Sequence, residues 1–174
     1  MTFLSKDNIR LRALEPEDLD WLFAIENNEL FWEISSTIQP FSKVLLARYI
    51  ENANQDFYSA KQLRLVILYK EKPVGLLDLF EYEPQDHRAG LGILILPEFE
   101  SKGIATTAIE IGVNYGFSIL QLHQIYVNIT ADNTRSIALF KKLNFQLVGT
   151  KKEWIYTQGT YKDELLFQRI NNDY

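Results

Sequence analysis

LGILILPEFESKGIATTAIEIGVNYGF, residues 91–117, is the stretch that decides the fold. An apolar strand leads into a short loop bounded by Pro97 and Gly103, and the loop opens directly into an amphipathic helix. The first turn of a helix has backbone N–H groups without intrahelical partners, and the aligned peptide dipoles add partial positive charge there. Gly103 lets the backbone approach a ligand closely, and Lys102 adds a point charge. The pattern therefore predicts an anion site, suited to phosphate, at residues 100–106.

The sequence that follows this junction extends the pattern. Residues 124–130 (QIYVNIT) indicate a second buried strand, and ADNTRSIALFKKLNF follows at residues 131–145. With these stretches the chain resembles the GNAT superfamily of N-acetyltransferases, in particular the spermidine/diamine and the ribosomal-protein N-terminal acetyltransferases. The family signature is Gln/Arg-x-x-Gly-x-Gly/Ala at a pyrophosphate loop, followed by a helix headed by Asn. Its matches here are residues 100–105 and 133–145, and the resemblance covers nearly the whole chain.

Composition favours one packed domain spanning residues 1–174. Hydrophobic residues make up 47% of the chain and aromatic residues 13%, which is enough for a sizeable core. No apolar run reaches the roughly 20 residues that span a bilayer, and the start lacks the pattern of a secretory signal, so we expect a cytoplasmic protein without a membrane partner. The net charge of -5 argues against nucleic acid as a partner. With no cysteine and two histidines, we expect no metal centre.

Periodicity and turn signals predict a mixed α/β fold, with a central sheet of about seven strands. Helices are expected at residues 16–27, 41–57, 103–120 and 134–143, and strands at residues 9–13, 63–69, 74–82, 88–96, 124–130, 146–156 and 161–170. Residues 70–73 and 158–159 suit tight turns, so the strands from residue 63 to residue 96 form an antiparallel meander. The resemblance implies helices on both faces of the sheet, a splayed pair of strands, and an acceptor site walled by the first two helices.

The resemblance also implies a binding site for acetyl-CoA, the expected co-substrate. Its pantetheine arm would pair with the main chain of the splayed strand, where backbone N–H and C=O groups need partners. Asn133 is expected to hydrogen-bond this arm, and the alternative is that Asp132 or Asn133 caps the following helix. The predicted cofactor-binding residues are Ile93, Leu94, Ile95, Glu100, Ser101, Lys102, Gly103, Ile104, Ala105, Thr106, Asn133 and Lys142.

Three residues depart from the family pattern. Glu100 stands where Gln or Arg is usual, which puts its side-chain contact with the pyrophosphate in doubt. Gly90 replaces a Glu that assists amine deprotonation, and Phe140 replaces a Tyr that protonates the leaving thiolate; neither can transfer a proton. We predict Asp78 as the catalytic base, because it lies among apolar neighbours and because alternation lets only one of Asp78 and Glu81 face the cleft. Weaker candidates are Glu33, Tyr126 and Tyr156.

The reaction implied by the resemblance is direct transfer of acetyl to a primary amine, with backbone N–H groups near Leu94 stabilising the oxyanion. The acceptor is a polyamine or another small amine, or a protein N-terminus. The uncharged residues 35–41 weaken the polyamine interpretation, because polyamine enzymes of this family carry acidic residues there. The alternative is an acyl-CoA sensor with little turnover, and an aminoglycoside-type acceptor stays open. Aromatic residues near the last hairpin suit either a homo-oligomer interface or packing within the chain: Trp154, Tyr156 and Tyr161.

Overall fold

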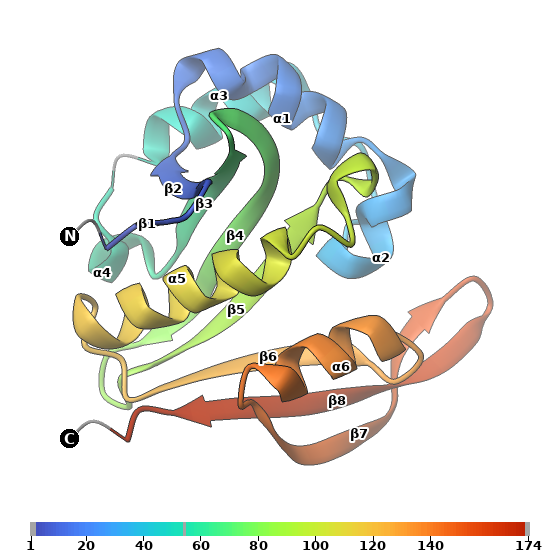
Figure 1. The fold of residues 1–174 in the computed structure, drawn as a ribbon. Helices are drawn as coiled ribbons and strands as arrows, with labels where there is room; N and C mark the ends of the chain where they lie inside the picture. Colours follow the sequence, from blue (N-terminus) through green and yellow to red (C-terminus); the bar gives the residue numbers. More distant parts are fainter. Residues whose placement is uncertain (1–2, 54, 173–174) are drawn as a thin grey trace.

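The computed structural model describes residues 3–53 and 55–172, and its strands form one eight-stranded sheet in the order β1-β2-β3-β4-β5-β6-β8-β7 (Figure 1). The strands are β1 (Ser5–Lys6), β2 (Ile9–Ala13), β3 (Leu63–Tyr69), β4 (Lys72–Glu83), β5 (Arg88–Ile95), β6 (Gln124–Thr130), β7 (Gln146–Thr157) and β8 (Thr160–Ile170). Strands β5 and β6 are parallel, and the other neighbours are antiparallel. The predicted mixed α/β fold is confirmed, with the short β1 added to the expected strands.

Helices lie on both faces of this sheet, as expected (Figure 1). The α-helices are α1 (Leu19–Glu26), α2 (Trp32–Ser35), α3 (Lys43–Asn52), α4 (Phe57–Ala60), α5 (Ile104–Ser118) and α6 (Thr134–Lys142), and the 3-10 helices are η1 (Pro16–Asp18), η2 (Glu29–Phe31) and η3 (Pro97–Phe99). The prediction of one domain over residues 1–174 also includes residues 1–2, 54 and 173–174, which lie outside the described residues.

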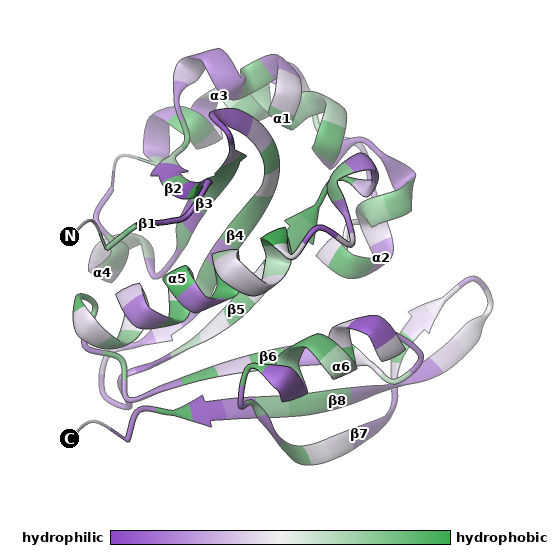
Figure 2. Ribbon diagram, in the orientation of Figure 1, coloured by the Kyte–Doolittle hydropathy of each residue, from purple (hydrophilic) through white to green (hydrophobic). Residues whose placement is uncertain are grey.

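Alternation along β3 and β4 separates two apolar layers. Ile67 and Leu77 pack against α5, whereas Val66 and Leu76 pack against α1 and α3. Apolar residues concentrate in β4, β5 and α5 (Figure 2). The two-layer arrangement follows from the period of two along a strand, which sends successive side chains to opposite faces.

The turn between β3 and β4 contains only two residues. Tyr69 pairs with Lys72, so only Lys70 and Glu71 form the turn, and both have positive φ values of 50° and 63°. Turns with positive φ at both central residues match the twist of the flanking strands. The predicted hairpin is therefore confirmed, and so is the meander from β2 to β5.

One prediction in the first part of the chain was wrong in detail, and two short helices there were not predicted. The helix expected at residues 41–57 begins at Lys43, because the Ser42 hydroxyl accepts a hydrogen bond from Leu45 N at 3.2 Å, and it ends at Asn52. Phe57 belongs to α4, a separate turn that is capped by Asp56. The short η2 and α2 between residues 29 and 35 were not predicted, since their exposed apolar residues show no clear period.

The central feature for function is the divergence of β5 from β6. The two strands pair only at three positions, Arg88 with Gln124, Ala89 with Ile125 and Gly90 with Tyr126. Beyond Gly90, β5 continues to pair with β4 on its other side as far as Ile95. Among the described strands, none pairs with residues 91–95 on the β6 side, so the predicted splay is confirmed.

Candidate functional site

A cleft of about 440 Å³ lies where β5 and β6 diverge. Its walls come from β5, from the loop that leads into α5, from α6 and from the η2–α2 segment. The lining residues are Phe31, Ile34, Ile93, Leu94, Ile95, Phe99, Glu100, Ser101, Gly103, Ile104, Ala105, Thr106, Asn133, Arg135, Ser136, Ala138, Leu139 and Lys142. Every residue predicted to bind the cofactor lines this cleft except Lys102.

The loop before α5 has the geometry of an anion site. Gly103 is the N-cap residue and has a φ of 76°, a left-handed conformation that favours glycine. The first hydrogen bond of the helix runs from Thr107 N to Gly103 O at 3.2 Å. The N–H groups of residues 104–106 therefore have no acceptor within the helix, and they carry the positive end of its dipole into the cleft.

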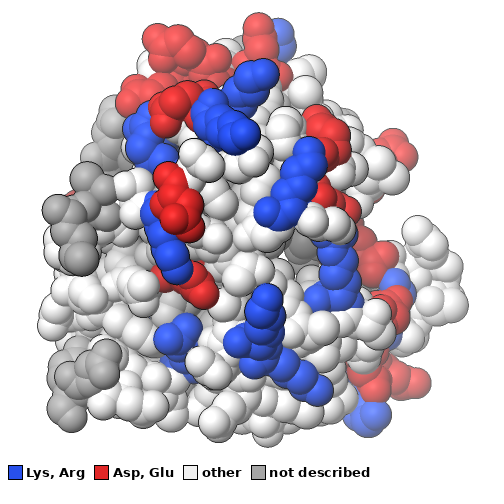
Figure 3. Space-filling model, in the orientation of Figure 1, with Lys and Arg blue, Asp and Glu red and all other residues white. Residues whose placement is uncertain are grey.

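Lys102 lies differently from its sequence-based prediction. Its Nζ donates to the Glu98 carbonyl oxygen at 3.0 Å, and the ammonium group lies 5.1 Å from the centroid of the Phe99 ring. Both contacts turn the side chain back over η3, because Lys102 follows that helix closely along the chain. The positive charge at the cleft comes from α6 instead, where Arg135 and Lys142 line the cavity. Basic side chains are visible over α6 in Figure 3.

Asn133 lies at the mouth of the cleft and begins α6. Its Oδ1 accepts a hydrogen bond from Ser136 N at 3.1 Å, so the capping alternative is confirmed. The contact between Asn133 and the cofactor arm stays a prediction, and its place in the cleft lining is compatible with that contact. Asp132 does not cap the helix; its carboxylate binds Lys162 at 2.7 Å.

Glu100 is exposed, and its carboxylate pairs with Arg135 at 2.5 Å. The two residues come from opposite sides of the cleft. Glu100 follows η3 at the end of β5, and Arg135 belongs to the first turn of α6. The pair joins residues 35 positions apart in sequence, and no local pattern could have predicted it.

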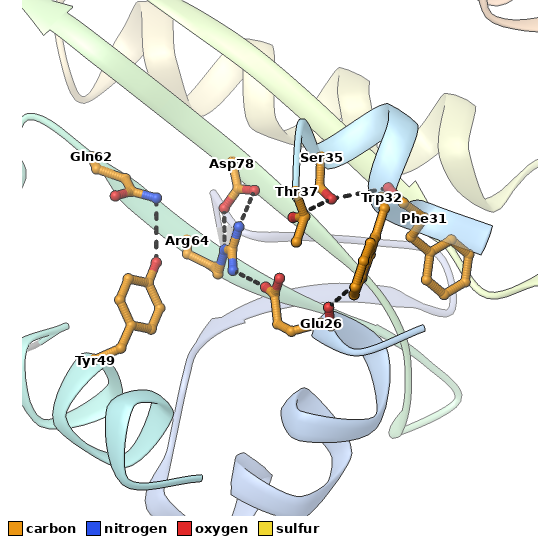
Figure 4. Close-up of polar contacts among 9 residues, drawn as sticks. All are labelled: Glu26, Phe31, Trp32, Ser35, Thr37, Tyr49, Gln62, Arg64 and Asp78. Atoms are coloured by element: carbon orange, nitrogen blue, oxygen red, sulfur yellow. Dashed lines mark hydrogen bonds and ion pairs between the residues drawn. The ribbon is translucent and has the colours of Figure 1, made fainter. Parts of the chain in front are cut away.

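On the opposite face of the sheet, Asp78 belongs to a partly buried charge cluster (Figure 4). Arg64 Nε donates to Asp78 Oδ1 at 2.7 Å, Arg64 Nη2 donates to Asp78 Oδ2 at 2.9 Å, and Arg64 Nη1 donates to Glu26 Oε1 at 2.5 Å. Burial alone would lower the pKa of the Arg64 guanidinium, but the two carboxylates outweigh burial and raise it. Asp78 does not line the cleft described above, and its role as a base stays a prediction.

The Gly90 position is closed by a neighbouring ring. A Cβ atom added at Gly90 would lie 2.4 Å from Phe80 Cε2, so Phe80 occupies the space that a larger residue would need. Phe140 is also enclosed, because it is buried and its ring packs edge-on against Phe145 with centroids 5.1 Å apart. Gly90 therefore leaves little room for a side chain beside Phe80, and Phe140 is packed within the core.

Tyr126 lies beside the closed Gly90 position. Its hydroxyl donates to Glu81 Oε2 at 2.6 Å, and its ring packs edge-on against Phe80. Burial, followed by the hydrogen bond to Glu81, raises the pKa of the Tyr126 phenol. Glu81 itself has a φ of 50° where the pairing of β4 with β5 shifts, so simple alternation from Asp78 does not hold beyond Phe80.

A second charge cluster holds α2 against the last hairpin. Lys162 on β8 binds Glu33 of α2 at 2.6 Å and Asp132 at 2.7 Å. The hydrogen bonds to Asp132 and Glu33 raise the pKa of the Lys162 ammonium. The Thr157 hydroxyl also donates to Glu33, at 3.4 Å. Glu33 therefore serves as a contact between two distant parts of the chain.

Two further observations concern sites other than the cleft. Within residues 3–53 and 55–172, no group of three or more His, Asp or Glu side chains is placed to hold a metal ion. None of the helices in this part of the chain is long and apolar enough to cross a membrane.

Known proteins share the fold and about a quarter of the sequence. Residues 8–146 match the model of the acetyltransferase (GNAT) domain family. The chain is 26% identical to a spermidine N(1)-acetyltransferase of Escherichia coli K12, covering 92% of this chain and 85% of the relative. It is 29% identical to a spermidine N(1)-acetyltransferase of Vibrio cholerae, covering 89% of this chain and 88% of the relative. A crystal structure of spermidine N-acetyltransferase from Vibrio cholerae in complex with CoA and spermine matches with a TM-score of 0.87 and 26% identity, covering 95% of this chain and 96% of that chain.

Proposed function

We propose, since the chain belongs to the acetyltransferase (GNAT) family, that it transfers the acetyl group of acetyl-CoA to the primary amine of a polyamine, of another small amine or of a protein N-terminus. The enzyme class follows from the family, and acetyl-CoA is the co-substrate of that class. The identity of the acceptor is the part that is proposed.

The observation that carries the proposal is the free edge of β5 beside the start of α5. Acetyl-CoA supplies an activated acyl group when it is bound. The main chain of residues 91–95 offers N–H and C=O groups to an extended arm, as an unpaired strand edge does. The amides of residues 104–106 and the cations Arg135 and Lys142 suit its phosphates.

An amine acceptor is supported by the carboxylates on the other side of the sheet. Glu26 and Asp78 hold the Arg64 guanidinium, and Glu33 with Asp132 holds the Lys162 ammonium. These carboxylates already bind positively charged side chains within the protein. Phe31 and Ile34, which lie near Glu33 in sequence, line the cleft with apolar side chains. A cationic amine that approaches from this side meets carboxylates and then apolar side chains, an order that suits loss of its proton before attack.

Asp78 is the proposed base. It lies opposite Gly92 in the pairing of β4 with β5, close to the free edge, and it faces α1 together with Arg64. Both Asp78 oxygens accept hydrogen bonds from Arg64, and this contact holds the carboxylate in place on β4. The backbone N–H groups around Leu94 are the proposed donors to the developing oxyanion.

The test is release of free thiol from acetyl-CoA with spermidine, spermine, small diamines and N-terminal peptides as acceptors. We expect turnover on one of these classes, and a loss of roughly 100-fold or more in kcat for Asp78→Asn, the usual range for a lost general base. Asp20→Asn, which removes an exposed ion pair with Lys43 on the same side of the molecule, is the matched control and should keep its activity. Tight binding of acetyl-CoA without turnover on the panel would favour a sensor instead.

The pH profile separates a base from a structural role for Asp78. A base gives an acidic limb in the profile of kcat/KM that disappears in Asp78→Asn. If the mutant loses stability but keeps the wild-type limb, the Asp78–Arg64 pair is structural only, and the base is another group.

A further inference from the structure

The ion pair between Glu100 and Arg135 joins two walls of the cleft assigned to the cofactor. Both side chains line the cleft, and they come from its two opposite sides. The pair links the loop after β5 to the first turn of α6, and Figure 1 shows these two elements on either side of the place where β5 and β6 separate. A phosphate-bearing ligand in the cleft would therefore lie close to this pair.

We propose that Glu100 is an internal competitor of the cofactor phosphates, and that Arg135 exchanges its Glu100 partner for the pyrophosphate when acetyl-CoA binds. The inference rests on the assignment of this cleft as the cofactor site. The proposal makes Glu100 a residue that lowers the affinity for the cofactor. It thereby gives a role to the position at which this chain departs from the usual Gln or Arg of the loop.

The charges lining the cleft support this exchange. Among the described lining residues, Arg135 and Lys142 are the cations and Glu100 is the sole carboxylate. An arginine prefers a bidentate anionic partner, and either a carboxylate or a phosphate fills that role. Glu100 therefore holds Arg135 at the cleft in a conformation suited to an anion, while it also opposes the negative charge of the ligand.

The exposure of the pair indicates whether Glu100 or the pyrophosphate is the stronger partner of Arg135. The Arg135 side chain is 60% exposed and the Glu100 side chain 40% exposed. Exposed pairs of this kind contribute little, because water and salt screen them. A pyrophosphate that also binds the free amides at the start of α5 has more partners than Glu100 has, so the ligand displaces the carboxylate, which then turns to solvent.

The experiment measures the Kd of CoA, and of pantetheine as a probe without phosphate, by calorimetry for wild type and variants. Glu100→Gln should bind CoA about two- to fivefold more tightly, the range expected from the loss of one exposed pair. Arg135→Gln should bind CoA on the order of tenfold more weakly, as a lost charge-assisted hydrogen bond implies. Neither change should alter the Kd of pantetheine, and the gain in Glu100→Gln should shrink at high salt.

The matched control is Glu110→Gln. Glu110 pairs with Lys6 with side-chain exposures of 35% and 55%, close to those of the cleft pair, but it does not line the cleft. Its Kd for CoA should equal that of wild type. Unchanged or weaker binding of CoA by Glu100→Gln would overturn the proposal while leaving the enzyme assignment intact. If the wild-type protein bound neither CoA nor acetyl-CoA, the assignment of the cleft as the cofactor site would be refuted. The proposed competition between Glu100 and the phosphates would then be refuted as well.

Discussion

Gly90 and Gly92 lie two residues apart on the same face of β5, yet a methyl group would meet different surroundings at each. At Gly90 the added atom would lie 2.4 Å from the Phe80 ring, whereas at Gly92 the nearest atoms are 3.7 Å and 3.9 Å away. We expect Gly90→Ala to lower the free energy of unfolding by roughly 1–3 kcal/mol, because the ring must shift. Gly92→Ala should stay within about 0.5 kcal/mol of wild type. Urea unfolding of both variants checks this, and equal stabilities would contradict it.

The residue scale is also where sequence reasoning reached its limit. The loop with Gly103 was predictable, because strand, loop and helix start follow one another along the chain. The partners of Glu100 and Asp78 were not predictable, since Arg135 and Arg64 lie 35 and 14 positions away and only the folded sheet brings them together. Asp78 could be recognised as a carboxylate among apolar residues, but nothing local indicated that both of its oxygens have a cationic partner.

At the scale of elements, the entry into α1 depends on a buried carboxylate. Asp18 is 6% exposed; its two oxygens accept from Arg12 at 2.6 Å and 2.8 Å, and from Glu15 N at 2.9 Å. Burial would raise the pKa of Asp18, but the bonds from Arg12 and from the Glu15 amide outweigh it and lower the pKa. The stabilisation is therefore complete above the unfolded value of about 3.9 and is lost as the pH falls through the lower folded value.

Asp18→Asn tests this dependence. At neutral pH the variant should be less stable than wild type by roughly 1–3 kcal/mol, the usual contribution of hydrogen bonds to a charged partner. The difference should shrink below about pH 4, where wild type also loses the charge. Denaturant unfolding of both proteins from about pH 2 to about pH 7 measures this difference in stability. The range includes the ordinary pKa of an aspartate and the lower pH at which the folded protein would protonate Asp18. A difference that stays constant across this range would contradict the assigned role of the charge.

Elements with a strong period were predicted well, and elements defined by capping were not. Strands β3 and β6 have the predicted bounds, because runs of apolar and β-branched residues mark them. The break after α3 and the short α2 depend on single side-chain caps and on contacts with the last hairpin. Such contacts carry no period along the sequence, so pattern reasoning extended α3 too far and missed α2.

At the scale of the whole molecule, the two parts of the sheet are joined by three residue pairs between β5 and β6, and Lys162 adds a link between β8 and α2. Lys162→Gln should speed amide hydrogen exchange in α2 and in the tip of the last hairpin, with little change in the urea midpoint, because the opening is local. The control is Lys151→Gln, whose ion pair with Glu164 lies within the C-terminal strands and does not reach α2. Exchange that rises equally in both variants would contradict the link.

The free edge of β5 has a consequence for how the chain avoids association. An unpaired strand edge is the usual template on which a second chain adds a strand and aggregation begins. Here residues 93–95 of this edge line a cleft whose other walls include α6 and the side chains of Phe31 and Ile34. A polypeptide that added a strand here would have to place its side chains between these walls. The walls of the cleft thus restrict the access of other polypeptides to this β-edge.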